Sequence, residues 1–161
     1  QLVNANWVKG NLSVTANAVN EPLTSTLTAD KVVATTTNGY HTIYQGITVQ
    51  PSTYYTMSFY GKAGEYGRIQ MGDSNTVGGG AYFDLNTGSL YGQTTSNDQS
   101  LYDQTANIES VGSGWYRCYV TFKTGSAQSG INQFLYIAKN DGTTSYAGDN
   151  TSGLYLFCSS L

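Results

Sequence analysis

Apolar and polar side chains alternate with a period of two residues along most of this sequence. The stretch "GSGWYRCYVTF", residues 113–123, places Tyr116, Cys118, Val120 and Phe122 at one parity. The other parity carries Trp115, Arg117, Tyr119 and Thr121. A β-strand points successive side chains to opposite faces. The stretch therefore predicts a strand with one buried face and a second face that presents an indole, a guanidinium and a phenol.

Eight stretches show this alternation, and turn signals such as "NG", "NTG", "GSG" and "NDG" separate them. They cover residues 7–16, 40–49, 53–67, 67–73, 80–88, 113–123, 133–142 and 152–160. Such a series is typical of an antiparallel all-β domain. We expect a β-sandwich of the jelly-roll type, with about eight strands in two sheets. The two longest gaps, residues 17–30 and 86–107, are expected to be loops.

Length and charge narrow the class of protein further. A chain of 161 residues fits one domain, residues 1–161. Only 11% of the residues are charged, the net charge is −3, and the seven Lys and Arg residues form no cluster, which argues against a nucleic-acid partner. No apolar run reaches the length of a membrane span. Because the chain starts at Gln1, we expect it to be processed or excised from a longer protein.

The residues needed for catalysis are scarce, so we expect no enzyme. His41 is the single histidine, and its parity places it with Ile43, away from the polar face. We expect it to be a buried, hydrogen-bonded side chain. No zinc motif is present, and no pair of carboxylates can be matched as a glycosidase pair from the sequence. Asp141 and Asp149, in "NDGTTSYAGDNTSG", suit either a structural calcium ion or simple turn formation, and no other cofactor is expected.

Five segments together resemble a known module. They are "TLTADKVV", "YHTIYQGITVQPSTYYTMSFYGKAGEYGRIQM", "AYFDLNTGSL", "IESVGSGWYRCYVTF" and "SYAGDNTSGLYLFCSSL". In this order they resemble a module of bacteriophage tail-fibre, tailspike and other virion-surface proteins, which is similar to the jelly-roll carbohydrate-binding modules of glycoside hydrolases. The resemblance runs from about Asn6 to Leu161, and "GWYR" and "GDNTSGLYLF" are its most specific pieces. The chain departs from the family at 157–160, where Phe-Cys-Ser-Ser replaces an aromatic-Gly-Ala-Gln ending.

This resemblance implies a winding, a partner and a location. With the eight strands numbered along the chain, it places strands 1, 8, 3 and 6 in one sheet and strands 2, 7, 4 and 5 in the other. Cys118 and Cys158 then lie two strand spacings apart, roughly 9 to 10 Å, which a disulfide does not span. We therefore expect two free, buried thiols. The implied partner is a glycan or polysaccharide, and the implied location is a virion surface or the extracellular space.

The sheet of strands 2, 7, 4 and 5 is our first choice for the ligand, and we expect its outer face to be concave. Its outward residues are Tyr44, Arg68, Gln70, Tyr82, Asp84 and Tyr136. Sugars offer apolar C–H faces and a rim of hydroxyls, so flat rings beside amide, guanidinium and carboxylate groups match them. Alternatively, cross-strand Tyr pairs and an Arg68–Asp84 contact are simple sheet-stabilising features.

The other sheet carries a second candidate face. Its outward residues are Tyr60, Lys62, Trp115, Arg117, Tyr119, Tyr155 and Phe157. This mixture suits glycan binding, but also packing against a neighbouring subunit or the rest of a fibre. Three alternatives to a phage glycan-binding module therefore stay open. The first is a structural or oligomerisation domain of a fibre or capsid decoration, and the second is the accessory module of a secreted polysaccharide-degrading enzyme. The third and least favoured is a lyase or hydrolase with a Tyr or His base.

Overall fold

A computed structural model describes residues 2–73, 80–94 and 101–160 of the chain, and these residues form strands, turns and loops without a helix. The strands are β1 (Val8–Gly10), β2 (Leu12–Asn20), β3 (Leu27–Ala34), β4 (Gly39–Tyr40), β5 (Thr42–Thr48), β6 (Tyr54–Ala63), β7 (Arg68–Asp73), β8 (Gly80–Asp84), β9 (Ser89–Thr94), β10 (Leu101–Gly112), β11 (Trp115–Thr124), β12 (Gly130–Ala138), β13 (Ser145–Tyr146) and β14 (Gly153–Ser160). Within this part of the chain, no helix has the length and apolar character needed to cross a membrane.

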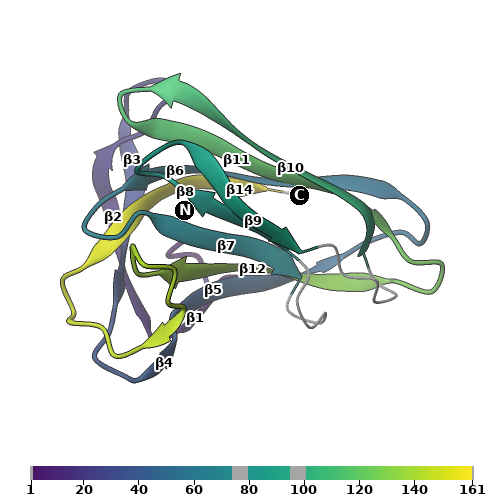
Figure 1. The fold of residues 1–161 in the computed structure, drawn as a ribbon, viewed down its shortest axis with the longest axis horizontal. Coiled ribbons are helices and arrows are strands. Elements are labelled where there is room, and N and C mark those ends of the chain that lie inside the picture. The colour runs from purple at the N-terminus through teal and green to yellow at the C-terminus, as the bar shows by residue number, and fades with distance from the viewer. Residues whose placement is uncertain (1, 74–79, 95–100, 161) are drawn as a thin grey trace.

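Two antiparallel sheets of six strands pack face to face as a β-sandwich (Figure 1). Sheet A has the order β1-β5-β12-β7-β8-β9, and sheet B has the order β10-β11-β6-β14-β3-β2. The short strands β4 and β13 pair with each other beside sheet A. The expected all-β sandwich is confirmed, but with fourteen strands in place of eight.

Most of the predicted strand order is correct. Predicted strands 2, 7, 4 and 5 are neighbours in sheet A as β5, β12, β7 and β8. Predicted strands 8, 3 and 6 are neighbours in sheet B as β14, β6 and β11. The expected pairing of strands 1 and 8 is wrong, because β3 lies between β2 and β14.

Both predicted loops contain strand. The gap 17–30 holds the end of β2 and the start of β3, and the gap 86–107 holds β9 and part of β10. These strands lack clean alternation for physical reasons. Strand β2 is interrupted by register shifts between Thr15 and Val19, and β9 and β10 are edge strands that leave many side chains exposed.

The inner faces of the two sheets form the core. Phe59 of β6 and Phe83 of β8 are both fully buried and meet edge to face, with ring centroids 5.8 Å apart. The inner residues expected of β11 also contribute, and Cys118, Val120 and Phe122 are buried there. Cys118 is free and buried as expected, while the side chain of Cys158 lies outside the described part of the structure.

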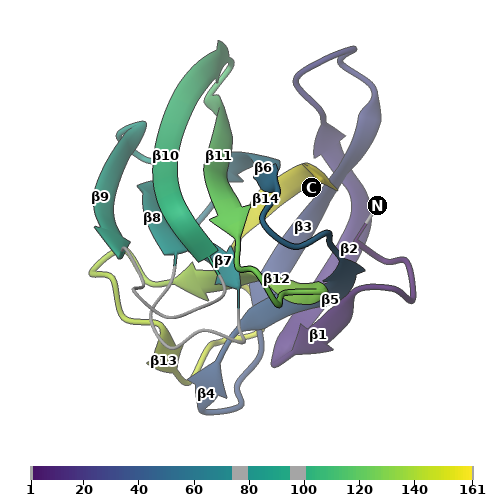
Figure 2. The same cartoon turned by 90° about the vertical axis from the view of Figure 1, so that its right-hand side faces the viewer.

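Sheet B is curved. In Figure 2 the β2–β3 hairpin and the β10–β11 hairpin rise on either side of β6 and β14. We call the outer face of sheet B between these two hairpins, with β6 and β14 at its centre, the trough. Strand twist accumulates across a sheet, so the outer strands of a six-stranded sheet are rotated relative to its central strands.

Candidate functional site

The six residues of the first-choice site share the outer face of sheet A. Strand register places Tyr136 opposite Gln70, and Gln70 opposite Tyr82. Arg68 lies opposite Asp84 one step along the same strands, while Tyr44 lies opposite Phe134. Directly opposed residues in antiparallel strands point to the same face. The alternation in the sequence therefore assigned this face correctly.

The charged pair on this face is engaged within the fold. Asp84 is only 7% exposed, and its carboxylate accepts hydrogen bonds from Arg68 Nε at 3.0 Å and from the Asn86 backbone N–H at 2.9 Å. The Arg68 guanidinium lies 4.6 Å from the ring centroid of Tyr91, beside the turn at Gly142. Although burial raises the pKa of the Asp84 carboxyl, the Arg68 and Asn86 hydrogen bonds bring it below its usual value. The chain itself already pairs these groups, as their sheet-stabilising interpretation predicts.

Tyr91 is a member of this face that the sequence did not single out. Its ring packs against Tyr82, with centroids 5.5 Å apart, and burial raises the pKa of its phenol to about 12. Its phenol oxygen is buried and has no hydrogen-bond partner among the described residues. It escaped prediction because the sequence pattern favours a loop over residues 86–107.

The remaining rings on sheet A stack mainly on one another. Tyr136 lies between Phe134 and Tyr40, with centroids 4.4 Å and 5.3 Å away, and Phe134 is buried. Gln70, the amide of the predicted site, is 9% exposed. Tyr44, Tyr82 and Tyr136 are half-buried, so this face offers rings but few accessible polar groups beside them.

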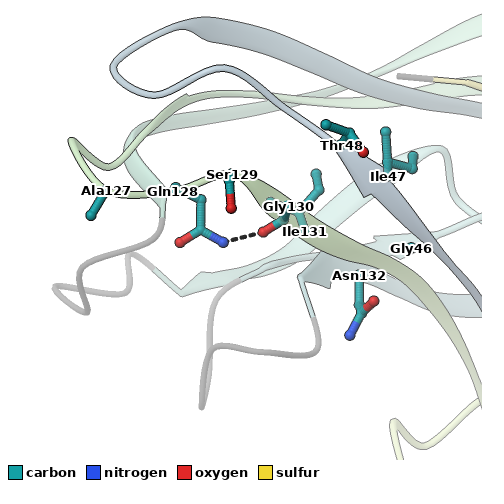
Figure 3. Close-up of a pocket in the computed structure, with 9 residues that line it drawn as sticks. All are labelled: Gly46, Ile47, Thr48, Ala127, Gln128, Ser129, Gly130, Ile131 and Asn132. Atoms are coloured by element: carbon teal, nitrogen blue, oxygen red, sulfur yellow. Dashed lines mark hydrogen bonds between the residues drawn. The ribbon is translucent and has the colours of Figure 1, made fainter.

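A hollow of about 450 Å³ lies where β5 and β12 meet the loop that precedes β12 (Figure 3). It is lined by Gly46, Ile47, Thr48, Ala127, Gln128, Ser129, Gly130, Ile131 and Asn132. The Gln128 amide donates a hydrogen bond to the carbonyl of Gly130. No aromatic or charged side chain is among these lining residues, so the hollow offers a sugar hydrogen bonds without a stacking surface.

The second-choice residues share the outer face of sheet B. One row across the strands reads Lys31, Tyr155, Lys62 and Trp115, and the next reads Phe157, Tyr60, Arg117 and Glu109. Tyr119 lies one step further along β11, opposite Ser58. Rings and hydrogen-bonding groups are therefore interleaved on adjacent strands, as the alternation predicted.

Polar groups on this face are accessible. Arg117 and Glu109 lie 4.0 Å apart with side chains 40% and 48% exposed. Tyr119 donates a hydrogen bond from its phenol to Glu109 at 2.8 Å and accepts one from Asn107 at 3.1 Å. The Arg117 guanidinium also lies 4.9 Å from the Tyr119 ring centroid. An exposed pair of this kind adds little stability, so its groups can exchange partners with a ligand at small cost.

A second hollow, of about 460 Å³, opens at one end of the trough between the tips of the two hairpins. It is lined by Val19, Asn20, Glu21, Pro22, Ser25, Leu27, Lys62, Val111, Gly112, Ser113 and Trp115. Its size falls within the range of small-molecule sites, about 300 to 1,000 Å³. It combines an aromatic ring, a charged amine and several polar groups in one concave place.

Trp115 is one of the residues that line this hollow. The sequence pattern predicts an exposed ring suited to subunit contacts, but Trp115 is only 2% exposed. Most of the other lining residues come from the two hairpin tips. No sequence signal could have revealed the burial of Trp115, because the alternation reports the face of a residue and not what lies above that face.

His41 is fully buried and serves the fold, as expected. Its Nδ1 lies 2.7 Å from the carbonyl oxygen of Asn11, and its Nε2 lies 2.9 Å from that of Tyr146. The ring also packs on Tyr146 at a centroid distance of 4.3 Å. It lies on neither outer face, and it connects the chain before β2 with the β4–β13 pair.

Asp141 and Asp149 each close a turn. Asp141 accepts a hydrogen bond from the backbone of Thr143 at 2.9 Å. Asp149 accepts hydrogen bonds from Ser152 and from Thr151, and these bonds hold the pKa of its carboxyl well below the usual value. The described residues contain no group of three His, Cys, Asp or Glu side chains that could hold a metal ion. The turn interpretation therefore has direct support, while calcium stays an untested alternative.

Comparison with known proteins adds no further assignment. No protein-family model matches the chain, and no curated protein sequence is similar to it. The function of the chain is therefore inferred from the two faces described above.

Proposed function

We propose that this chain is a non-catalytic glycan-binding module whose binding surface is the trough on sheet B. The observation that carries the proposal is the interleaving of rings and hydrogen-bonding side chains on β14, β6 and β11 between two raised hairpins. Tyr60, Tyr155 and Phe157 are half-buried, so each keeps part of its ring accessible.

The chemistry of this face suits a saccharide chain. A pyranose ring stacks its C–H face on an aromatic ring, and its hydroxyls bond to planar carboxylate and guanidinium groups. Tyr60 and Phe157 lie 6.2 Å apart, and Arg117 and Glu109 continue their row. A sugar placed on Tyr60 would meet a stacking surface and a bidentate donor on neighbouring strands. Sheet A is the second candidate surface, since its polar groups are less accessible.

The parent protein is also part of the proposal. On the resemblance of its sequence segments, we place the module in a larger phage adsorption or virion-surface protein, outside the cell. The accessory module of a secreted polysaccharide-degrading enzyme is the alternative parent. In both settings the task of the module is to hold a polysaccharide near the rest of the chain.

A glycan and polysaccharide binding screen tests this function, run with calcium and with a chelator. Two pairs of variants separate the faces: Tyr60→Ala and Tyr155→Ala on sheet B, and Tyr82→Ala and Tyr136→Ala on sheet A. We expect binding that only the sheet B pair abolishes, with all four variants folded. Loss from the sheet A pair alone would move the site to that face. Absence of binding to every polysaccharide would overturn the function, and the chelator arm decides whether calcium takes part.

The competing proposal is a structural domain that joins copies of a fibre protein. Its support is a group of exposed apolar side chains at the hairpin tips, where Leu23 and Leu27 are 57% and 58% exposed. Light scattering tests it, because a stable oligomer that Leu23→Asp dissociates would favour assembly. Trp115, the residue that the sequence pattern favours for such contacts, is too deeply buried to make them directly.

A further inference from the structure

The hollow at the end of the trough is lined by a lysine whose ammonium has no partner among the residues that the structure describes. Lys62 lies between Tyr155 and Trp115 in the row across sheet B. Of the other cations on this face, Lys31 pairs with Glu65 at 3.1 Å, Arg117 with Glu109, and Lys123 lies over the Tyr54 ring. Among the described residues, no ion pair, side-chain hydrogen bond or ring contact involves the Lys62 ammonium.

The one acidic residue lining the hollow does not offer its charge to a ligand. The Glu21 carboxylate accepts hydrogen bonds from the backbone and hydroxyl groups of its own loop, at Leu23, Thr24 and Thr26. The residue is 2% exposed. Burial raises the pKa of this carboxyl, but the hydrogen bonds lower it to about 2, so the loop is held in place by an ionised side chain. The accessible charge inside the hollow is therefore the ammonium of Lys62.

Neutral polar groups and an aromatic residue line the same hollow. Trp115 is 2% exposed and is among the lining residues. Asn20, Ser25 and Ser113 add amide and hydroxyl groups. The lining thus combines one positive charge with an aromatic residue and neutral groups that suit hydroxyls.

We propose that this hollow binds a carboxylate-bearing sugar unit, so that the trough selects acidic polysaccharides. The carboxylate would pair with Lys62, and the ring hydroxyls would bond to the rim. This inference rests on the proposed glycan-binding function and names its substrate class. The chain as a whole has net charge −3, so its surface in general repels such polymers, and selection depends on the local cation.

The test compares one polymer with and without its charge. Polygalacturonate and the same polymer with its carboxyl groups reduced to alcohols differ only at the group that Lys62 would bind. Affinity is measured by electrophoresis through gels containing each polymer. Because a hydrogen bond to a charged group contributes about 1.5 to 3 kcal/mol, we expect the wild type to prefer the acidic polymer about tenfold or more.

Variants at two cations identify the source of that preference. Lys62→Gln should bring the ratio of the two affinities close to one, and Lys62→Arg should restore the preference. Lys123→Gln, on the same face and with the same change in net charge, should keep it. Equal losses in the two Gln variants, a preference that survives Lys62→Gln, or no preference in the wild type would each overturn the inference. Failure of the glycan-binding function itself gives a different result: no neutral or acidic polymer then binds in a way that Tyr60→Ala weakens.

Discussion

Replacing His41 with alanine is the most direct test of the role assigned to this residue. The substitution removes a fully buried ring that packs 4.3 Å from Tyr146 and lies between two carbonyl oxygens. Removing the ring leaves a cavity, and together these effects cost about 2 kcal/mol, at the lower end of the range for large-to-small substitutions in a core. Loss of hydrogen bonding between the ring and these carbonyl oxygens adds about 1 kcal/mol. We therefore expect the free energy of unfolding to fall by about 3 kcal/mol.

Thermal unfolding makes this magnitude measurable. The entropy of unfolding for 161 residues is about 0.34 kcal/mol/K, so the loss corresponds to a fall in Tm of about 9 °C. Thr36→Ala, at an exposed residue nearby, is the control and should change stability by less than about 0.5 kcal/mol. A loss below about 1 kcal/mol in His41→Ala would refute the structural role described for this ring. If the wild type had an enzymatic turnover and the folded variant lost it, the non-catalytic proposal would fail.

Three further predictions concern backbone fit, acid stability and thiol reactivity. Gly153→Ala should lower the free energy of unfolding, measured in urea, by about 3 kcal/mol or more, because the added Cβ would lie 1.9 Å from the Val32 carbonyl oxygen. A variant as stable as the wild type would contradict this close approach. The pKa of Glu21 is lowered from 4.5 to about 2, so its contribution to stability is present above pH 4.5 and is lost as the pH falls toward 2. Glu21→Gln should flatten that part of the pH–stability curve, and an unchanged acid limb would show that other carboxyls dominate it. Burial raises the pKa of the Cys118 thiol, so in a Cys158→Ser chain it should react with a thiol reagent only after unfolding; rapid labelling of the native chain would contradict its burial.

The trough and the hollow have different origins in the chain. Tyr60, Arg117 and Phe157 belong to central strands whose backbone is paired on both sides, so their positions are fixed by the sheet. The wall formed by Glu21 belongs to a turn that is held by hydrogen bonds to one carboxylate. We therefore expect Glu21→Gln to weaken binding in the hollow more than stacking on Tyr60. A comparison of the affinities for the acidic polymer and for its reduced form measures this difference.

The side chains that share a face could be predicted from the amino-acid sequence alone. Period-two alternation is a local property of the extended backbone, so it assigns Tyr136, Gln70 and Tyr82 to one surface and Tyr60 and Arg117 to another, and strand register confirms both sets. The burial of Cys118 follows from the same alternation. These features depend on the strand to which a residue belongs, and not on what the strand meets in space.

Which of these surfaces is open depends on the folded molecule. Asp84 is paired because the register of β7 and β8 sets it opposite Arg68. Trp115 lines a hollow whose other residues include segments distant in the sequence. Parts of the edge strands β2 and β10 fall where the pattern predicts loops, because exposed edges carry little alternation. The curvature of sheet B comes from twist summed over six strands, and no single strand encodes it. Residues from both hairpin tips line one hollow with Lys62, whose amine is the unpaired charge among the described residues of that hollow.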